Sequence, residues 1–198
     1  MSYSEQESFW SGEFGDKYVE RNSGFSTINH FSKILLNNRI KIESVIELGS
    51  NVGINLDSLK AIYPDCKTFG VEINKKAYQI LSKNHDSYLG SIYDFQATEK
   101  YDLAFTYGVL IHQNPIKLDE VYSKLFSLSS NYILICETIS HEPVMVSYRG
   151  NDNKLFKRDF GKDFWEKYPD LKLIDYGFFW SMDDYTRSGD ANWFLFKK

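Results

Sequence analysis

An acidic residue and two glycines stand where a parallel sheet can hold a nucleotide-like ligand. Residues 44–55 (SVIELGSNVGIN) predict a buried strand containing Glu47, a turn with Gly49 and Gly53, and then a helix. Glycine adopts positive φ easily and lets a ligand approach the backbone at the N-terminus of the helix. The dinucleotide pattern G-x-G-x-x-G is absent from this turn. With no pyrophosphate to cradle, the acid suits a ligand that carries positive charge.

Glu72 is a second acidic candidate. Residues 67–73 (KTFGVEI) predict the next strand, and Glu72 lies near its end, at the distance from the glycine turn where an acid binds a ribose. A carboxylate there can accept hydrogen bonds from both ribose hydroxyls. The alternative is a surface glutamate whose negative charge is stabilised by the dipole at the N-terminus of the next helix. The spacing from Gly49 favours the ribose interpretation.

His112 lies in the segment 107–115 (YGVLIHQNP), which leaves the expected fourth strand. Ligands of doubly wound sheets bind beyond the carboxyl ends of the strands, so we expect His112 near the ligand. Imidazole has an ordinary pKa of about 6.5 and can remove a proton from a hydroxyl at neutral pH. His112 is therefore the catalytic candidate, either as a general base or as a residue that holds the acceptor. A purely structural histidine is the alternative.

Two further segments carry chemical groups at the same edge of the sheet. Residues 9–22 (FWSGEFGDKYVERN) are dense in aromatic residues, and predict either a packing arm or a lid over the ligand. Arg21 within this segment suits a carboxylate through its bidentate fork. Residues 148–160 (YRGNDNKLFKRDF) form the only locally basic stretch, and their position after the fifth strand predicts recognition of an anionic acceptor. A merely solvated charge run is the alternative.

Hydrophobic periodicity and breakers supply the elements that position these residues. The expected strands are 44–48, 67–73, 87–92, 101–110, 131–139, 171–180 and 191–198, and the expected helices are 25–38, 53–63, 74–84, 115–128 and 162–168. We expect Ser26 to cap the first helix and Asn74 the third. Alternation of strands with helices predicts an α/β, Rossmann-like, doubly wound sheet of seven mostly parallel strands in three layers. The last two strands have no helix between them and predict an antiparallel pair. Residues 140–160 predict an irregular loop.

Length and composition agree with one domain. The 198 residues divide into an N-terminal helical arm (1–40), a ligand-binding core (41–139), and an acceptor loop with the C-terminal strand pair (140–198). A net charge of −4 disfavours a nucleic-acid partner. No stretch of about 18 apolar residues and no apolar leader occur, which predicts a soluble, cytoplasmic protein without membrane contact. Two cysteines without spaced His or Cys neighbours predict reduced thiols and no metal site.

The segments FWSGEFGDKYVERN, ELGSNVGIN, GVLIHQNP and YRGNDNKLFKRDFG together resemble the methylases associated with pseudaminic acid biosynthesis, a branch of the class I S-adenosylmethionine-dependent methyltransferases. The resemblance runs over most of the chain. It implies methyl transfer from S-adenosylmethionine to a hydroxyl or amino group of a bacterial surface-sugar precursor. The basic loop fits a carboxylated or nucleotide-linked sugar.

The resemblance also implies roles for individual residues. Aromatic residues of the arm would cover the sulfonium, Tyr18 and Arg21 would hold the methionine carboxylate, and Ser91 and Ile92 would meet the adenine. The expected cofactor-binding residues are Trp10, Tyr18, Arg21, Glu47, Gly49, Ser50, Asn51, Gly53, Glu72, Ile73, Ser91, Ile92, Tyr107 and Gly108, and the expected acceptor-binding residues are His112, Tyr148, Arg149, Lys157 and Arg158.

Two other functions remain open from the sequence. The first is a nicotinamide-dependent oxidoreductase on the same fold, against which the missing G-x-G-x-x-G pattern argues. The second is a module that binds S-adenosylmethionine without catalysis. The presence of Glu47, Glu72 and His112 argues against it.

Overall fold

The computed structural model describes residues 3–21, 25–186 and 189–198; Asn22, at the end of the aromatic N-terminal segment, lies outside these ranges. The strands are β1 (Ser44–Leu48), β2 (Lys67–Glu72), β3 (Asp86–Leu89), β4 (Tyr101–Tyr107), β5 (Ser129–Glu137), β6 (Val144–Tyr148), β7 (Asn151–Lys157), β8 (Lys172–Phe179) and β9 (Ala191–Lys197). The α-helices are α1 (Glu5–Ser11), α2 (Glu13–Arg21), α3 (Ile28–Phe31), α4 (Ile54–Ile62), α5 (Lys75–Leu81), α6 (Leu118–Leu128) and α7 (Phe160–Lys167). A π-helix (Ser32–Leu36) and two 3₁₀ turns (Leu110–His112 and Pro115–Lys117) complete the elements.

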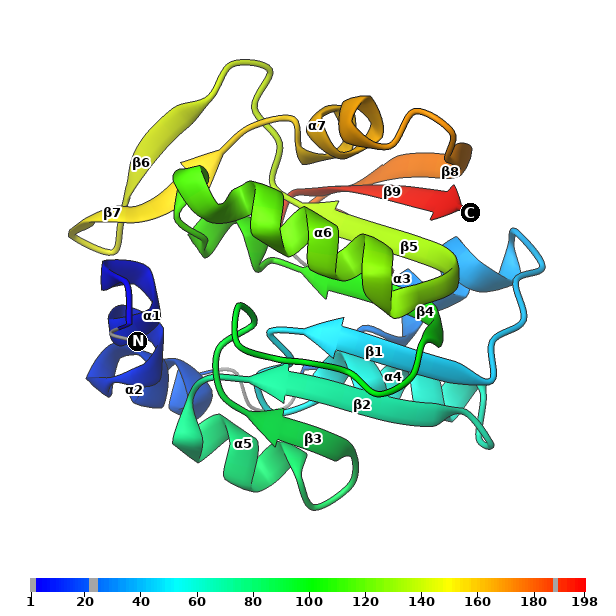
Figure 1. Ribbon diagram of the computed structural model, residues 1–198, viewed down its shortest axis with the longest axis horizontal. Coiled ribbons are helices and arrows are strands. Elements are labelled where there is room, and N and C mark those ends of the chain that lie inside the picture. The colour runs from blue at the N-terminus through cyan, green and yellow to red at the C-terminus, as the bar shows by residue number, and fades with distance from the viewer. Residues whose placement is uncertain (1–2, 22–24, 187–188) are drawn as a thin grey trace.

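The central sheet confirms the predicted fold class. Its strand order is β3-β2-β1-β4-β5-β9-β8 (Figure 1). The five strands β3, β2, β1, β4 and β5 pair in parallel with their neighbours in this order, whereas β9 is antiparallel to both of its neighbours, β5 and β8. The chain winds from β1 toward β3 on one side and from β4 toward β8 on the other. The switch of direction therefore falls between β1 and β4, where ligands of such sheets bind.

Alternation along the strands divides the core between the two faces of the sheet. On one face, Ile46 of β1 and Ala104 of β4 pack with residues of α6 and α7. On the other face, Val45 and Phe105 pack with residues of α3, the π-helix, α4 and α5. These two apolar layers give the predicted three-layer α/β/α arrangement.

The first predicted helix is shorter than expected at its N-terminus and changes type. It begins at Ile28 and continues as the π-helix over residues 32–36, instead of spanning residues 25–38. The cap position belongs to Thr27, not Ser26. The Thr27 hydroxyl bonds the Asn55 side chain at 2.8 Å and Ser58 at 3.1 Å. The chain before Ile28 is thus tied to α4 rather than wound into the helix.

Strands β3 and β4 each end three residues earlier than their apolar patterns predict. Strand β3 stops at Leu89 rather than residue 92, because the next residues turn and the Ser91 hydroxyl accepts a bond from the Tyr93 amide. Strand β4 stops at Tyr107 rather than residue 110. The amides of residues 109–111 bond the Glu137 carboxylate instead of a neighbouring strand.

The predicted cap of α5 is confirmed, since the Asn74 side chain accepts a hydrogen bond from the Ala77 amide at 2.9 Å.

Residues 140–160 do not form the irregular loop that the sequence predicts. Strands β6 and β7 pair in an antiparallel hairpin that projects beside the N-terminal helices (Figure 1). Arg149 (φ 50°) and Gly150 (φ 78°) make its turn, and positive φ at both central positions is the geometry that two-residue hairpins favour. The β7 sequence NDNKLFK has little alternation of apolar and polar residues, so its pattern does not indicate a strand.

Phe105→Ala is expected to lower the free energy of unfolding by about 3–5 kcal/mol, because the fully buried ring leaves a cavity between β4 and the helices. Ile116→Ala is the matched control, since Ile116 is 91% exposed and its loss should change stability by less than about 0.5 kcal/mol. Urea denaturation followed by circular dichroism measures both. Equal destabilisation by the two variants would contradict the assigned core.

Candidate functional site

A cavity opens at the carboxyl ends of β1, β2 and β4, beside the point where the sheet order reverses. The N-terminal helices form its outer wall. Its described lining residues are Gln6, Glu7, Trp10, Gly15, Tyr18, Val19, Phe25, Thr27, Gly49, Ser50, Asn51, Ile54, Asn55, Val71, Glu72, Ile73, Asn74, Ala77, Ser91, Ile92, Tyr93, Tyr107, Gly108, Val109, His112 and Gln113.

The glycine turn forms the floor of the cavity. Gly49 has φ 79°, and its amide and that of Ser50 donate to the Val71 carbonyl at 2.8 and 3.0 Å. A Cβ at Gly49 would lie 2.6 Å from a methyl group of Val109, so glycine is required by space as well as by φ. Gly53 does not line the cavity. It precedes α4 at φ 91° and permits close packing against Leu81 and His85.

Glu72 lies on the cavity wall at the end of β2. Its two carboxylate oxygens accept hydrogen bonds from the backbone N–H of Asn51 at 2.7 Å and from the backbone N–H of Asn74 at 2.6 Å. Burial raises the pKa of Glu72, and these backbone bonds oppose the increase. Each oxygen keeps a further lone pair, so the side chain can still accept hydrogen bonds from a ligand.

Glu47 stands behind the cavity instead of lining it. Its side chain is fully buried, and one oxygen accepts from the Asn55 amide group at 2.6 Å. Burial, with a smaller contribution from the Glu72 charge, raises the pKa of Glu47 to about 8. Asn55 lines the cavity, whereas Glu47 does not. Glu47 therefore contributes to the cavity wall by holding the Asn55 side chain in place.

Glu137 organises the turn that carries His112, and sequence reasoning missed it. Its carboxylate accepts from the amides of Val109 at 3.0 Å, Leu110 at 2.9 Å and Ile111 at 3.4 Å. Burial raises its pKa to about 7 despite these bonds. The available signal was an acid at the end of an apolar strand, as at Glu47 and Glu72.

His112 is 8% exposed and lies against the ring of Trp10, with the two ring centroids 4.6 Å apart. Its Nδ1 is 2.7 Å from the carbonyl oxygen of Lys154. A carbonyl can only accept, so Nδ1 carries the proton and Nε2 keeps a lone pair. Burial lowers the pKa of His112 to about 4, partly offset by this hydrogen bond. His112 is thus a neutral hydrogen-bond acceptor at pH 7.

The N-terminal arm is anchored to the core beside the cavity. A capping box between Ser4 and Glu7 starts α1, and the Ser91 hydroxyl donates to the Glu7 carboxylate at 2.5 Å. The Asn74 amide group donates to the Trp10 carbonyl at 3.2 Å and to the Asp16 carboxylate at 2.9 Å. These bonds place Trp10 and Ser91 on the cavity wall, where the sequence also places them.

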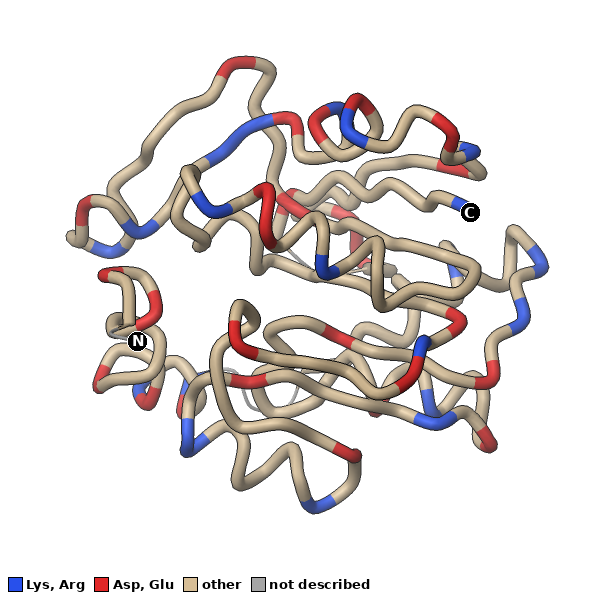
Figure 2. Tube along the Cα trace, viewed as in Figure 1, with Lys and Arg blue, Asp and Glu red and all other residues tan. Residues whose placement is uncertain are grey.

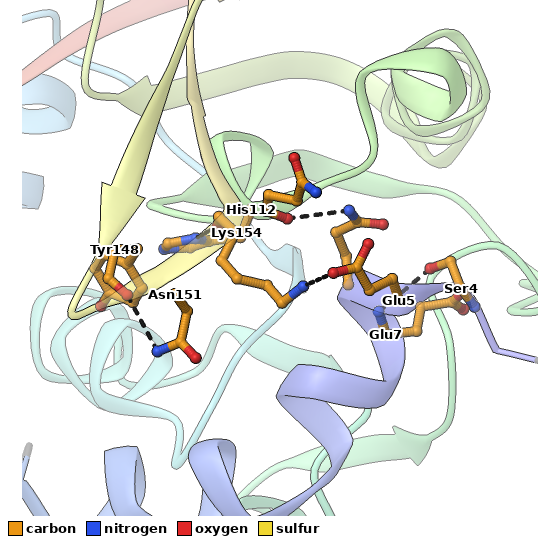
Figure 3. A network of polar contacts seen from close by, with 9 residues as sticks. Ser4, Glu5, Glu7, His112, Tyr148, Asn151 and Lys154 are labelled. Carbon is orange, nitrogen blue, oxygen red and sulfur yellow. Dashed lines mark hydrogen bonds and ion pairs between the residues drawn. The ribbon is translucent and has the colours of Figure 1, made fainter.

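The same arm is anchored to the β6–β7 hairpin. Glu5 forms an ion pair with Lys154, whose side chain is buried (Figure 3). The Gln6 side-chain amide donates a hydrogen bond to the Asn153 carbonyl at 3.1 Å. The Tyr148 ring lies 4.9 Å from His112 and 5.7 Å from Phe14 between ring centroids. Gln6, Glu7 and Lys154 could not be singled out from the sequence, because their roles depend on contacts between residues that lie 84, 147 or 149 positions apart.

The predicted basic residues do not line the cavity. Arg149 lies in the hairpin turn, and Arg158 pairs with Asp163 of α7. Arg21 stacks on Phe14 at 5.3 Å and on Tyr18 at 5.8 Å from its guanidinium carbon. Lys157 lies at the end of β7, also outside the lining. Figure 2 shows Lys and Arg dispersed along the trace.

Three buried polar atoms on lining residues have no hydrogen-bond partner in the described part of the chain. They are the Gln6 Oε1, the Trp10 Nε1 and the Asn51 Oδ1. Buried polar groups are rarely left unpaired, because each costs free energy. Two acceptors and one donor on residues of this wall are thus left without a partner among the described residues.

No family model matches this sequence, and no curated protein matches it. Solved structures match its fold over nearly the whole chain. The 1,6-didemethyltoxoflavin N1-methyltransferase of Burkholderia thailandensis, with bound 1,6-didemethyltoxoflavin and S-adenosylhomocysteine, superposes with a TM-score of 0.71 at 11% identity, covering 98% of this chain and 86% of that one. Magnesium protoporphyrin IX methyltransferase of Synechocystis PCC 6803, with S-adenosylhomocysteine, gives 0.69 at 12% identity over 97% of both chains. The plantazolicin methyltransferase gives 0.67 at 15% identity, covering 98% and 94%.

The chain has the class I methyltransferase fold. Within the described ranges, no helix combines the length and apolarity needed to cross a bilayer. Over those same residues, no group of three or more His, Cys, Asp or Glu side chains is placed to hold a metal ion.

His112 is expected to stay neutral, as the Nδ1–H tautomer, down to about pH 5 and to gain its second proton near pH 4. Burial disfavours the charged ring, which moves the titration below the ordinary value of about 6.5. Two-dimensional ¹⁵N NMR of the imidazole nitrogens measures both the tautomer and the titration. A His112 midpoint near 6.5 would contradict the assigned burial.

Proposed function

We propose that this chain is an S-adenosylmethionine-dependent methyltransferase that acts on a hydroxyl or amino group of a small polar molecule. The observation that supports this most is the cavity at the switch point of a class I methyltransferase fold, with the glycine turn as its floor and Glu72 on its wall. The unpaired atoms of Gln6, Trp10 and Asn51 fit a ligand with polar groups of both kinds.

The lining chemistry fits the cofactor. Glu72 would accept the ribose hydroxyls, while Ile73, Ser91 and Ile92 would contact the adenine. Rings of the arm and of β4 suit a sulfonium, since aromatic faces attract cations; those that line the cavity are Trp10, Tyr18 and Tyr107. The bound cofactor supplies a methyl group already activated on sulfur.

The chain itself needs to position the acceptor and exclude water. Alignment of the reacting atoms can supply roughly 7–11 kcal/mol in favourable cases. Trp10 and the arm close the outer wall, and the His112 Nε2 offers a lone pair to an N–H or O–H of the acceptor. His112 would hold that hydrogen and so orient the acceptor toward the methyl group.

The acceptor proposed from the sequence is more specific. The resemblance to the pseudaminic acid-associated methylases extends the proposal to a bacterial surface-sugar precursor. Matching structures are named for varied acceptors, among them 1,6-didemethyltoxoflavin, a plantazolicin analogue and magnesium protoporphyrin IX. This variety supports methyl transfer on the fold without favouring one acceptor.

Calorimetric titration is expected to show micromolar binding of S-adenosylmethionine and S-adenosylhomocysteine and no comparable binding of NADH. Gly49→Arg should abolish binding, because its side chain would fill the cavity floor. Gly150→Arg is the matched control, since it places the same residue at a similar positive φ but in open space at the hairpin turn. Tight NADH binding would support an oxidoreductase. If neither sulfur compound bound the folded wild type, the proposal would fail.

A further inference from the structure

We propose that Asn153 is a positioning residue for the cavity. Its left-handed backbone turns two successive carbonyls of β7 toward Gln6 and His112, and so leaves both side chains as hydrogen-bond acceptors for a ligand. This inference rests on the methyltransferase function proposed above and concerns how the acceptor molecule is held. Asn153 itself is not among the described residues that line the cavity.

The β6–β7 hairpin is irregular where it meets the cavity. Its pairing shifts register between Val146 and Tyr148, so residues 152–154 of β7 lie opposite Ser147 alone. Within this bulge Asn153 has φ 57°. A bulge interrupts the ladder of backbone hydrogen bonds and bends the strand, and bulges recur beside active sites.

The bulge directs two successive carbonyls toward the same cavity. In a regular strand, the carbonyls of successive residues point to opposite edges. Here the Asn153 carbonyl accepts a hydrogen bond from the Gln6 side-chain amide at 3.1 Å, and the Lys154 carbonyl oxygen lies 2.7 Å from the Nδ1 of His112. Gln6 and His112 both line the cavity, so both bonds leave β7 on that side. A left-handed residue at the bulge is what breaks the usual alternation.

These two bonds decide which polar atoms of Gln6 and His112 stay free. A carbonyl can only accept, so it takes the NH₂ end of the amide and the protonated nitrogen of the imidazole. The Gln6 Oε1 is then buried without a partner in the described part of the chain, and the His112 Nε2 keeps a lone pair. Both atoms therefore suit a ligand that donates O–H or N–H bonds.

The bulge also holds the helix that covers His112. Lys154 forms an ion pair with Glu5 of α1, and its Nζ lies 5.3 Å from the centroid of the Phe9 ring (Figure 3). The same helix carries Trp10, whose ring packs on His112. The arm and the imidazole are therefore both fixed by residues of one bulge.

The residue type at position 153 can be varied without removing a buried side chain, because Asn153 is exposed. Glycine and asparagine adopt positive φ most readily, alanine does so less readily, and the β-branched valine does so least. The variants Asn153→Gly, Asn153→Ala and Asn153→Val therefore change the stability of the bulge in steps.

Two-dimensional ¹⁵N NMR of the imidazole nitrogens in the ligand-free protein at pH 7 tests the proposal. We expect the Nδ1–H tautomer of His112 to predominate in the wild type and in Asn153→Gly. The fraction of the Nε2–H tautomer should rise at least about fivefold in Asn153→Val, because a ring released from the carbonyl can carry its proton on either nitrogen. Asn153→Ala should lie between them.

Arg39→Val is the matched control. Arg39 is also exposed and has φ 54°, but it precedes β1, at the end of the sheet away from the cavity. The wild-type tautomer should persist in this variant. An unchanged tautomer in Asn153→Ala and Asn153→Val, or an equal change in Arg39→Val, overturns the proposal. Circular dichroism checks the fold, and Asn153→Ala decides alone where Asn153→Val does not fold.

Calorimetric titration with S-adenosylhomocysteine separates this inference from the proposed function. Its affinity for the Asn153 variants should stay within about twofold of the wild type, because the bulge is separate from the glycine turn and from Glu72. The expected tautomer shift without binding by the wild type would reject the methyltransferase function alone. Unchanged tautomers with intact binding would reject only the role of Asn153.

Discussion

The cavity is shaped by two buried carboxylates at the carboxyl ends of strands on either side of the switch point. Glu72 ends β2 and Glu137 ends β5, and a buried carboxylate is tolerated only where donors surround it. Glu72 accepts hydrogen bonds from backbone amides that follow β1 and β2, and Glu137 accepts hydrogen bonds from backbone amides that follow β4. The strand ends thus fix the loops that surround the cavity, and the position of His112 follows from Glu137.

The outer wall of the cavity is built differently. Helices α1 and α2 pack on the core through Asn74 and Ser91, and on the β6–β7 hairpin through Lys154 and Asn153. The hairpin in turn fixes the tautomer of His112 through a backbone carbonyl. Segments from both ends of the chain therefore meet at one imidazole, and a change in either alters how that ring faces the ligand.

The sequence predicted the parts of the fold that local rules determine. Strand and helix order, the glycine turn, the Asn74 cap and the antiparallel C-terminal pair all follow from periodicity and breakers. Glu72 and His112 could be placed at the cavity because parallel strands present their carboxyl ends at one edge. The β6–β7 hairpin escaped prediction because β7 has little apolar alternation. The roles of Gln6, Glu7, Lys154 and Glu137 depend on tertiary contacts, which no local pattern encodes. The ion pair of Arg158, a predicted acceptor-binding residue, with Asp163 of α7 is likewise visible only in the fold.

A crystal structure of the complex with S-adenosylhomocysteine would show whether the buried carboxylates shape the cofactor site. We expect the ribose hydroxyls to bond Glu72, the adenosine to lie over the turn at Gly49, and at least two of the Gln6, Trp10 and Asn51 polar atoms to gain partners. We also expect Glu137 to keep its hydrogen bonds to three backbone amides. A ligand bound elsewhere, or in this cavity without contact to Glu72, would contradict the claim that the buried carboxylates shape the cofactor site.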